Sequence, residues 1–177
     1  MKGFVMNNKG YIQVYTGNGK GKTTAAIGLS IRAAAAGKKV FIGQFVKGMH
    51  YSELDLLKGI ENITVKQYGS DCFILKDPSE NDIELALCGL REMEAVLKGG
   101  AYDLVVMDEA TIALYYALFS FESLKHAVEN RDEKVEVVIT GRYAPEELID
   151  MADLVTEMKE IKHYYSKGVE ARTGIEK

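Results

Sequence analysis

The sequence has few cysteines, histidines and prolines, and each shortage narrows the kinds of protein that it can encode. Its 177 residues include 2 cysteines, 3 histidines and 2 prolines. Cys72 and Cys88 lack the spacing of a metal site, so we expect buried free thiols in a reducing, cytoplasmic setting. The histidines have no partner at metal-binding spacing, and the sequence therefore predicts no zinc site.

Long apolar runs and an excess of positive charge are also missing. No segment approaches the length that crosses a membrane, and the opening residues MKGFVMNNKGY lack the apolar core of a signal peptide. The formal net charge of −4 argues against a broad surface for nucleic acid or for an anionic membrane. We therefore expect a cytoplasmic protein with no nucleic-acid partner and no membrane partner.

Six short apolar runs alternate with helical patterns along the chain. Several runs are apolar almost throughout, which is typical of parallel strands that are covered on both faces. The expected strands are 11–16, 39–46, 63–68, 103–109, 136–141 and 153–158. The expected helices are 23–37, a short one from Ser52, 79–99, 120–130 and 145–151. This alternation predicts an α/β fold with a doubly wound, mostly parallel sheet, in a single domain over residues 1–177.

Capping signals support the starts of three of these helices. Ser52 followed by Asp55 resembles a capping box. Ser79 followed by Asp82 predicts an N-cap for the long helix that ends at Gly99 and Gly100. Pro145 occupies a plausible first-turn position.

The run TGNGKGKTT lies where the first strand should turn into the first helix. Gly21-Lys22-Thr23 completes the P-loop pattern G-x-x-x-x-G-K-[ST], although Thr16 stands where the first glycine belongs. Such a loop binds a polyphosphate through backbone N–H groups and the helix N-terminus, because glycines let the backbone approach closely. We expect Lys22 to contact phosphate oxygens, Thr23 to bind Mg²⁺ and Lys20 to add a further cation. The predicted nucleotide-binding residues are Gly17, Asn18, Gly19, Lys20, Gly21, Lys22, Thr23 and Thr24.

Polar residues that follow two later strands predict the rest of the site. LVVMDEA places Asp108 and Glu109 at the carboxyl end of a buried strand, where Walker-B-type acids hold Mg²⁺; in isolation such a pair is as often a helix start. Arg142 follows the next strand, so we expect it to point at the phosphates. The alternative for Arg142 is a surface ion pair with Glu146 or Glu147.

Several segments together resemble the ATP:corrinoid adenosyltransferases of the CobA/BtuR type. They are TGNGKGKTTAA, QFVKG, LVVMDEA, ITGR with ADLVTEM, and the tail KHYYSKGVEARTGIE. The resemblance runs from about Tyr11 to Glu176. The P-loop is shared with many NTPases, whereas the tail and the ITGR–ADLVTEM block are far more selective.

The resemblance implies a RecA-like P-loop fold and transfer of the 5′-deoxyadenosyl group of ATP to the Co(I) centre of a corrinoid, with triphosphate leaving intact. It implies catalytic roles for Lys22, Arg142 and Glu109, with Thr23, Glu109 and Asp108 at the magnesium. It also implies a homodimer, with ATP bound in a flipped sense, and a flavin-type reductase that supplies electrons for Co(I). No general base is needed, because Co(I) attacks carbon without removal of a proton.

The chain departs from this family in three places. It begins about ten residues before its first strand, where relatives often have a longer N-terminal helix. Cys72 and Ile74 flank Phe73 where many relatives carry two nearby aromatics that are implicated in displacing the lower ligand of the corrinoid. Lys177 replaces the usual terminal aromatic.

Two other functions remain open on the same P-loop framework. A small-molecule kinase would need a group that orients or deprotonates an acceptor hydroxyl, and no residue stands out for that task. A nucleotide-dependent switch ATPase would need an arginine finger, for which Arg32 or Arg172 is a weak candidate. Intact triphosphate among the products would indicate adenosyl transfer, and ADP would indicate either alternative.

Overall fold

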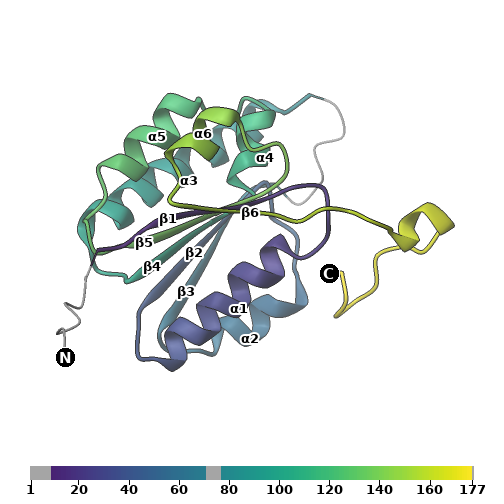
Figure 1. Ribbon diagram of the computed structural model, residues 1–177, viewed down its shortest axis with the longest axis horizontal. Helices are drawn as coiled ribbons and strands as arrows, with labels where there is room; N and C mark the ends of the chain where they lie inside the picture. Colours follow the sequence, from purple (N-terminus) through teal and green to yellow (C-terminus); the bar gives the residue numbers. More distant parts are fainter. Residues whose placement is uncertain (1–8, 71–76, 177) are drawn as a thin grey trace, which may run out of the picture.

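A six-stranded parallel sheet forms the centre of the molecule (Figure 1). The computed structural model describes residues 9–70 and 77–176. The strand order is β3-β2-β4-β5-β1-β6, and each neighbouring pair is parallel. The strands are β1 (Ile12–Thr16), β2 (Val40–Phe45), β3 (Ile63–Tyr68), β4 (Leu104–Asp108), β5 (Glu136–Thr140) and β6 (Leu154–Glu157). The predicted α/β fold is confirmed, and each expected strand is present to within one residue at either end.

Helices cover both faces of this sheet (Figure 1). One face carries α1 (Lys22–Ala35) and α2 (Ser52–Lys58). The other carries α3 (Glu80–Gly99), α4 (Ala110–Tyr115), α5 (Phe121–Glu129) and α6 (Glu146–Met151). After β6 the chain runs past the carboxyl edge of the sheet into a tail that contains the short 3₁₀ helix η1 (Tyr164–Lys167). Because both faces are covered, β2 and β4 are buried along their whole length, which explains their apolar sequences.

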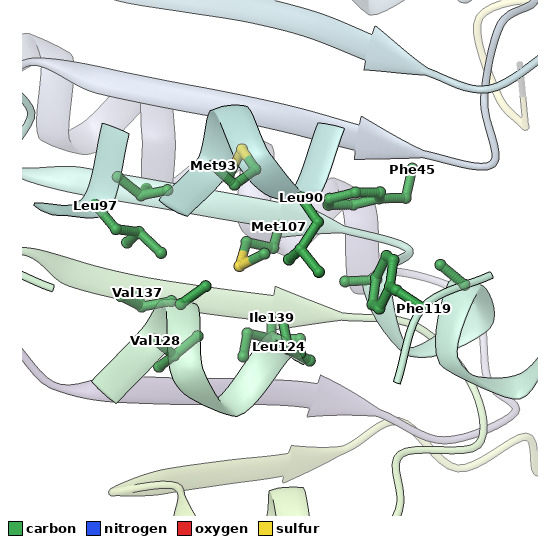
Figure 2. Packing of buried hydrophobic residues seen from close by; sticks show 14 of the residues in the cluster. Phe45, Leu90, Met93, Leu97, Met107, Phe119, Leu124, Val128, Val137 and Ile139 are labelled. Atoms are coloured by element: carbon green, nitrogen blue, oxygen red, sulfur yellow. The ribbon is translucent and has the colours of Figure 1, made fainter. Parts of the chain in front are cut away.

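The larger part of the core lies between the sheet and the helices α3 and α5 (Figure 2). Met93 of α3 and Met107 of β4 are fully buried there, and the rings of Phe45 and Phe119 meet edge to face with centroids 5.4 Å apart. A second cluster packs α1 and α2 against the opposite face. These two clusters fix the strands from both sides, so the loops at the strand ends are held on a rigid support.

The helix starts differ in part from the sequence predictions. The capping box of Ser79 and Asp82 is confirmed, with both of its hydrogen bonds present. The one proposed at Ser52 is wrong, because Ser52 is the first helical residue and Tyr51 is the N-cap, with no side-chain capping bond. Pro145 is likewise the N-cap of α6, one residue before its first turn. The helix α4 was not predicted.

The structure also bears on two expectations that were drawn from composition. Cys88 lies on the solvent side of α3 and is exposed, so the expectation of a buried thiol there is wrong; Cys72 lies outside the described residues. Among the described residues, no helix is both long and apolar enough to cross a membrane.

Candidate functional site at the carboxyl edge of the sheet

The predicted site residues follow strands that are neighbours in the sheet. In parallel strands all carboxyl ends meet at one edge, so the residues after β1, β4 and β5 come together there. The backbone at this edge is strained. Val46 after β2, Glu109 after β4 and Tyr143 after β5 all have φ between 57° and 59°, a region that costs a residue with a side chain of the order of 1–3 kcal/mol. Strain of this kind is concentrated at functional sites.

The phosphate loop begins one residue later than the P-loop pattern suggests, and the structure gives the reason. Thr16 is still part of β1 and pairs with Glu157 of β6, so it needs no glycine. Gly17 makes the turn, with φ 95°. A Cβ atom on Gly17 or Gly19 would lie 2.5 or 2.6 Å from the carbonyl oxygen of Met158, so no side chain fits there.

The loop glycines therefore have a second purpose beside phosphate binding: they let the end of β6 pass close by. The N–H of Gly19 donates to the carbonyl of Met158 at 2.6 Å. Asn18 is exposed, and so is Thr24 in the first turn of α1. In this structure the Gly19 N–H is thus already bonded to the Met158 carbonyl, directly after β6. A phosphate would first contact the other N–H groups of the loop.

Lys22 lies folded back over its own loop. Its ammonium donates to the carbonyl oxygens of Gly17 at 2.7 Å and Gly19 at 2.9 Å, and the residue is only 6% exposed. Burial lowers the pKa of Lys22, and the nearby Glu109 carboxylate opposes that shift. The loop thus encloses a positive charge that is held by weak neutral acceptors, which a phosphate oxygen would readily replace.

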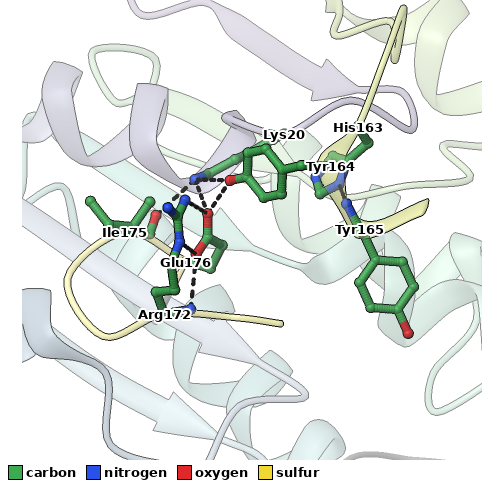
Figure 3. Close-up of polar contacts among 7 residues, drawn as sticks. All are labelled: Lys20, His163, Tyr164, Tyr165, Arg172, Ile175 and Glu176. Atoms are coloured by element: carbon green, nitrogen blue, oxygen red, sulfur yellow. Dashed lines mark hydrogen bonds and ion pairs between the residues drawn. The ribbon is translucent and has the colours of Figure 1, made fainter. Parts of the chain in front are cut away.

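Lys20 is held by the C-terminal tail instead of by the loop (Figure 3). Its ammonium donates to Glu176 Oε1 at 3.0 Å, to the Ile175 carbonyl at 2.8 Å and to the Tyr164 hydroxyl oxygen at 3.4 Å. Glu176 also accepts from Arg172, whose guanidinium lies 3.0 Å from Oε1, and this bond holds the pKa of Glu176 well below its usual range. Sequence reasoning noticed the tail as a pattern but did not place it against the phosphate loop.

Asp108 is the most enclosed polar group of the site, at 1% exposure. Its Oδ1 accepts from the hydroxyls of Thr23 at 2.8 Å and Thr140 at 2.7 Å. Its Oδ2 accepts from Gln44 at 3.2 Å and from the Lys47 ammonium at 2.8 Å. Burial alone would raise the pKa of Asp108, but the charge of Lys47 and these donors hold it below the usual range.

Glu109 sits at the point where β4 turns into α4. Its backbone N–H donates to the Thr140 hydroxyl at 3.0 Å, and its carboxylate lies beside Gly141, where a Cβ atom would be 3.3 Å from Oε2. Burial and the adjacent Asp108 charge raise the pKa of Glu109, whereas Lys47, Lys22 and Arg142 oppose the shift. A bound cation would reduce the repulsion between the Asp108 and Glu109 carboxylates.

Arg142 is exposed beyond the end of β5. Its backbone carbonyl accepts from the Thr111 hydroxyl at 2.6 Å, which fixes the turn. In the described part of the chain its guanidinium makes no ion pair with Glu146 or Glu147, and it is close enough to influence the pKa values of Lys22 and Glu109. The surface ion pair is thus not formed among the described residues, and the inward role of Arg142 stays a prediction.

Three residues beside Asp108 were missed by sequence reasoning: Gln44, Lys47 and Thr140. All three lie at or just beyond the carboxyl ends of apolar strands. The segment QFVKG, which contains Gln44 and Lys47, was noticed only as part of a family resemblance. Tyr115 is 60% exposed and stacks on Tyr143 with ring centroids 4.4 Å apart. The positions Cys72, Phe73 and Ile74 lie outside the described residues.

The oxygen atoms at this edge suit Mg²⁺. Thr23 donates its proton to Asp108 and so keeps its oxygen lone pairs for a cation. Hard carboxylate and hydroxyl oxygens are the ligands that Mg²⁺ prefers, usually one or two from the protein with phosphates and water completing the set. In residues 9–70 and 77–176 no three His, Cys, Asp or Glu side chains gather closely enough to hold an ion unaided.

Comparison with known proteins gives a consistent result. The family model for ATP:corrinoid adenosyltransferase BtuR/CobO/CobP matches residues 8–176. The chain is 36% identical over 177 residues to the corrinoid adenosyltransferase of Escherichia coli strain K12, covering 96% of this chain and 87% of the relative. It is 36% identical over 172 residues to corrinoid adenosyltransferase CobA of Salmonella typhimurium (95% and 86%), and 31% identical over 172 residues to the enzyme of Pseudomonas aeruginosa (96% and 85%).

Proposed function

The chain belongs to the ATP:corrinoid adenosyltransferases, enzymes that transfer the adenosyl group of ATP to a corrinoid, and we propose how its residues serve that reaction. The observation that carries the proposal is the meeting of the phosphate loop with Asp108 and Glu109 at one edge of the sheet, through the 2.8 Å bond from Thr23 to Asp108. This edge provides cations and hydroxyls for a triphosphate.

The phosphate chain binds over the loop between Gly17 and Thr24. Lys22 exchanges its two carbonyl partners for phosphate oxygens, and the N-terminus of α1 adds positive potential. Arg142 approaches from the end of β5. Lys20 is available to the phosphates only when it leaves Glu176, so its contribution depends on the position of the tail.

Mg²⁺ binds at Thr23, Asp108 and Glu109. The burial of Asp108 and the raised pKa of the adjacent, half-buried Glu109 support this, because a divalent cation would offset the negative charge of these two carboxylates. When bound, the ion supplies positive charge to the phosphate oxygens and helps to orient them.

The residues then assist an attack on carbon. The Co(I) centre of the corrinoid substrate donates an electron pair to C5′ of ATP; the cobalt–carbon bond forms, the C5′–oxygen bond breaks, and its electron pair leaves with triphosphate. No proton moves. Lys22 and Arg142 stabilise the charge that grows on the departing oxygen, and the rigid strand ends align the phosphate chain.

The setting of the enzyme completes the proposal. Residues 1–177 act as one nucleotide-binding domain, in a cytoplasmic homodimer whose subunit contact shelters the flat corrinoid. The exposed stack of Tyr115 on Tyr143 beside Arg142 supports a surface that a large flat group covers. Co(I) forms only by reduction, so a flavin-type reductase supplies the electrons.

Product analysis tests the function directly. Purified protein is given ATP, Mg²⁺ and chemically reduced cobalamin, and the absorbance change from Co(I) to light-sensitive alkylcobalt is followed with phosphate analysis. We expect adenosylcobalamin and intact triphosphate in equal amounts. ADP or inorganic phosphate with unchanged cobalamin would instead indicate a kinase or a switch ATPase and would refute the proposal.

A further inference from the structure

The Lys47 ammonium contacts both Thr23 and Asp108, two of the residues that are proposed to bind magnesium. Its ammonium lies 2.8 Å from Asp108 Oδ2 and 3.3 Å from Thr23 Oγ1. The side chain is 13% exposed and that of Asp108 1% exposed. The ammonium therefore uses the same hydroxyl oxygen that a metal ion would use, since the Thr23 proton is already donated to Asp108.

The backbone around Lys47 is shaped to hold it there. Val46, a β-branched residue, has φ 57°, which is a genuine outlier and turns the chain sharply after β2. The loop after β3 crosses at close range. A Cβ atom on Gly69 would lie 2.3 Å from the backbone nitrogen of Lys47, and one on Gly48 would lie 2.4 Å from the Gly69 carbonyl oxygen. A strained residue and two glycine contacts thus fix the start of the Lys47 side chain.

An aromatic ring flanks the same ammonium. Tyr51, the N-cap of α2, presents its ring 5.2 Å from Lys47 Nζ, a cation–π distance. The positive charge is consequently held by one carboxylate, one hydroxyl and one ring, with little water around it. Such a charge is costly to leave without a partner.

We propose that Lys47 is a resident cation of the magnesium site, which keeps Mg²⁺ out until the triphosphate arrives. Mg²⁺ alone would have to displace the ammonium from Asp108 and leave it unpaired in a nearly dry place. A bound triphosphate offers the ammonium a phosphate oxygen instead, so metal and nucleotide enter together. Lys47 thus acts as a binding residue that passes from Asp108 to a phosphate, and the inference rests on the proposed assignment of Thr23 and Asp108 to the metal.

The test measures Mg²⁺ binding in the absence of nucleotide, using the melting temperature of the purified protein. Wild type should show no shift with Mg²⁺ alone. Lys47→Gln should melt lower than wild type and then rise by about 4 °C at Mg²⁺ tenfold above its dissociation constant. Its affinity for Mg²⁺ together with ATP, measured by calorimetry, should fall roughly tenfold because a phosphate contact is lost.

Two matched variants separate charge placement from charge loss. Lys47→Arg keeps a cation at the position and should behave as wild type. Lys38→Gln removes the same charge from an ion pair with Asp103, at the other end of the same two strands, and should leave the response to Mg²⁺ unchanged. An equal rise with Mg²⁺ alone in wild type and in Lys47→Gln would overturn the inference.

A measurement on unmodified protein covers the case in which Lys47→Gln does not fold. The ¹⁵N signal of the Lys47 ammonium, assigned with Lys47→Arg, should stay in place with Mg²⁺ alone and move when ATP is added. Movement with Mg²⁺ alone overturns the inference. Failure of wild type to bind Mg²⁺ even with ATP would refute the metal site itself, whereas normal binding with an unmoved signal would refute the role of Lys47 alone.

Discussion

Two lysine–aspartate pairs join the region of β2 to that of β4, one at each end of these strands. At the amino ends, Lys38 and Asp103 are 3.9 Å apart, with side chains 57% and 49% exposed. At the carboxyl ends, Lys47 and Asp108 are 2.8 Å apart and 13% and 1% exposed. The same chemistry is solvated at one edge and enclosed at the other, because the segments at the ends of β1, β2 and β5 donate four hydrogen bonds to Asp108 and cover it.

This difference shows that the fold encloses its charged side chains at the carboxyl edge of the sheet. An exposed pair is screened by water and contributes little to stability, whereas a buried pair cannot lose one member without leaving an unsolvated charge. The carboxyl edge collects such charges in Lys22, Lys47, Asp108 and Glu109. Substitutions at matched positions of the two edges should therefore have unequal effects. Three predictions compare the two edges, and a fourth concerns the tail that covers the carboxyl edge.

The largest effect is expected from Asp108→Ala compared with Asp103→Ala. Loss of Asp108 leaves Lys47 buried without its carboxylate and should lower the free energy of unfolding by about 4 kcal/mol. Asp103 also accepts a hydrogen bond from the Lys39 N–H at 2.8 Å, but both of these contacts are exposed, so its loss should cost only about 1 to 2 kcal/mol. Urea denaturation of both variants measures the contrast. Equal losses would show that burial does not separate the two pairs.

Lys22→Ala should come next, with its effect on the reaction and not on the fold. In residues 9–70 and 77–176 the hydrogen bonds of the Lys22 ammonium go to two neutral carbonyls of its own loop, so stability should fall less than in Asp108→Ala. The rate of adenosylation at saturating ATP should fall roughly 100- to 1000-fold, since a charge on the leaving triphosphate loses its partner. Lys134→Ala, an exposed lysine at the amino edge, is the control. A full rate in Lys22→Ala would show that its assigned role is wrong.

Glu109→Gln should give a smaller, pH-dependent effect. The folded protein holds the pKa of Glu109 above its ordinary value, chiefly through burial and Asp108, so wild type loses stability as the pH rises past about 4.3. The variant lacks that loss, and its melting temperature without nucleotide should exceed that of wild type by a margin that grows as the pH rises above about 4.3. Glu133→Gln, at the exposed amino edge, should follow wild type. Parallel curves for all three proteins would contradict this reading of Glu109.

The smallest effect is expected in the tail. Glu176→Gln weakens the hold on Lys20 and frees that ammonium for the phosphates, so the KM for ATP should fall by no more than about threefold. The change should shrink in high salt, because the contact is exposed. Glu170→Gln, in the same tail, should leave the KM unchanged. A KM that rises in Glu176→Gln would mean that the tail positions Lys20 for binding instead of withholding it.

Most of the fold was predictable, because runs such as 103–109 are apolar along their whole length and parallel strands need that. The phosphate loop, Asp108 and Glu109 were predictable as well, since each lies in a pattern that is local in sequence. Lys47 was not: it is 24 residues from Thr23 and 61 from Asp108, and only the order of strands in the sheet brings the three together. The exposed face of Cys88 likewise depends on how α3 is rotated against the core.

The position of β1 between β5 and β6 has a consequence for the newly made chain. The strand that leads into the nucleotide loop emerges from the ribosome first, yet the strands that flank it begin at Glu136 and Leu154. Pairing across such a separation is slow, because the intervening loop must close before any contact rewards it. The strand of the sheet that is synthesised first is thus among the last to be secured in it, and a chain arrested before β5 should bind no ATP.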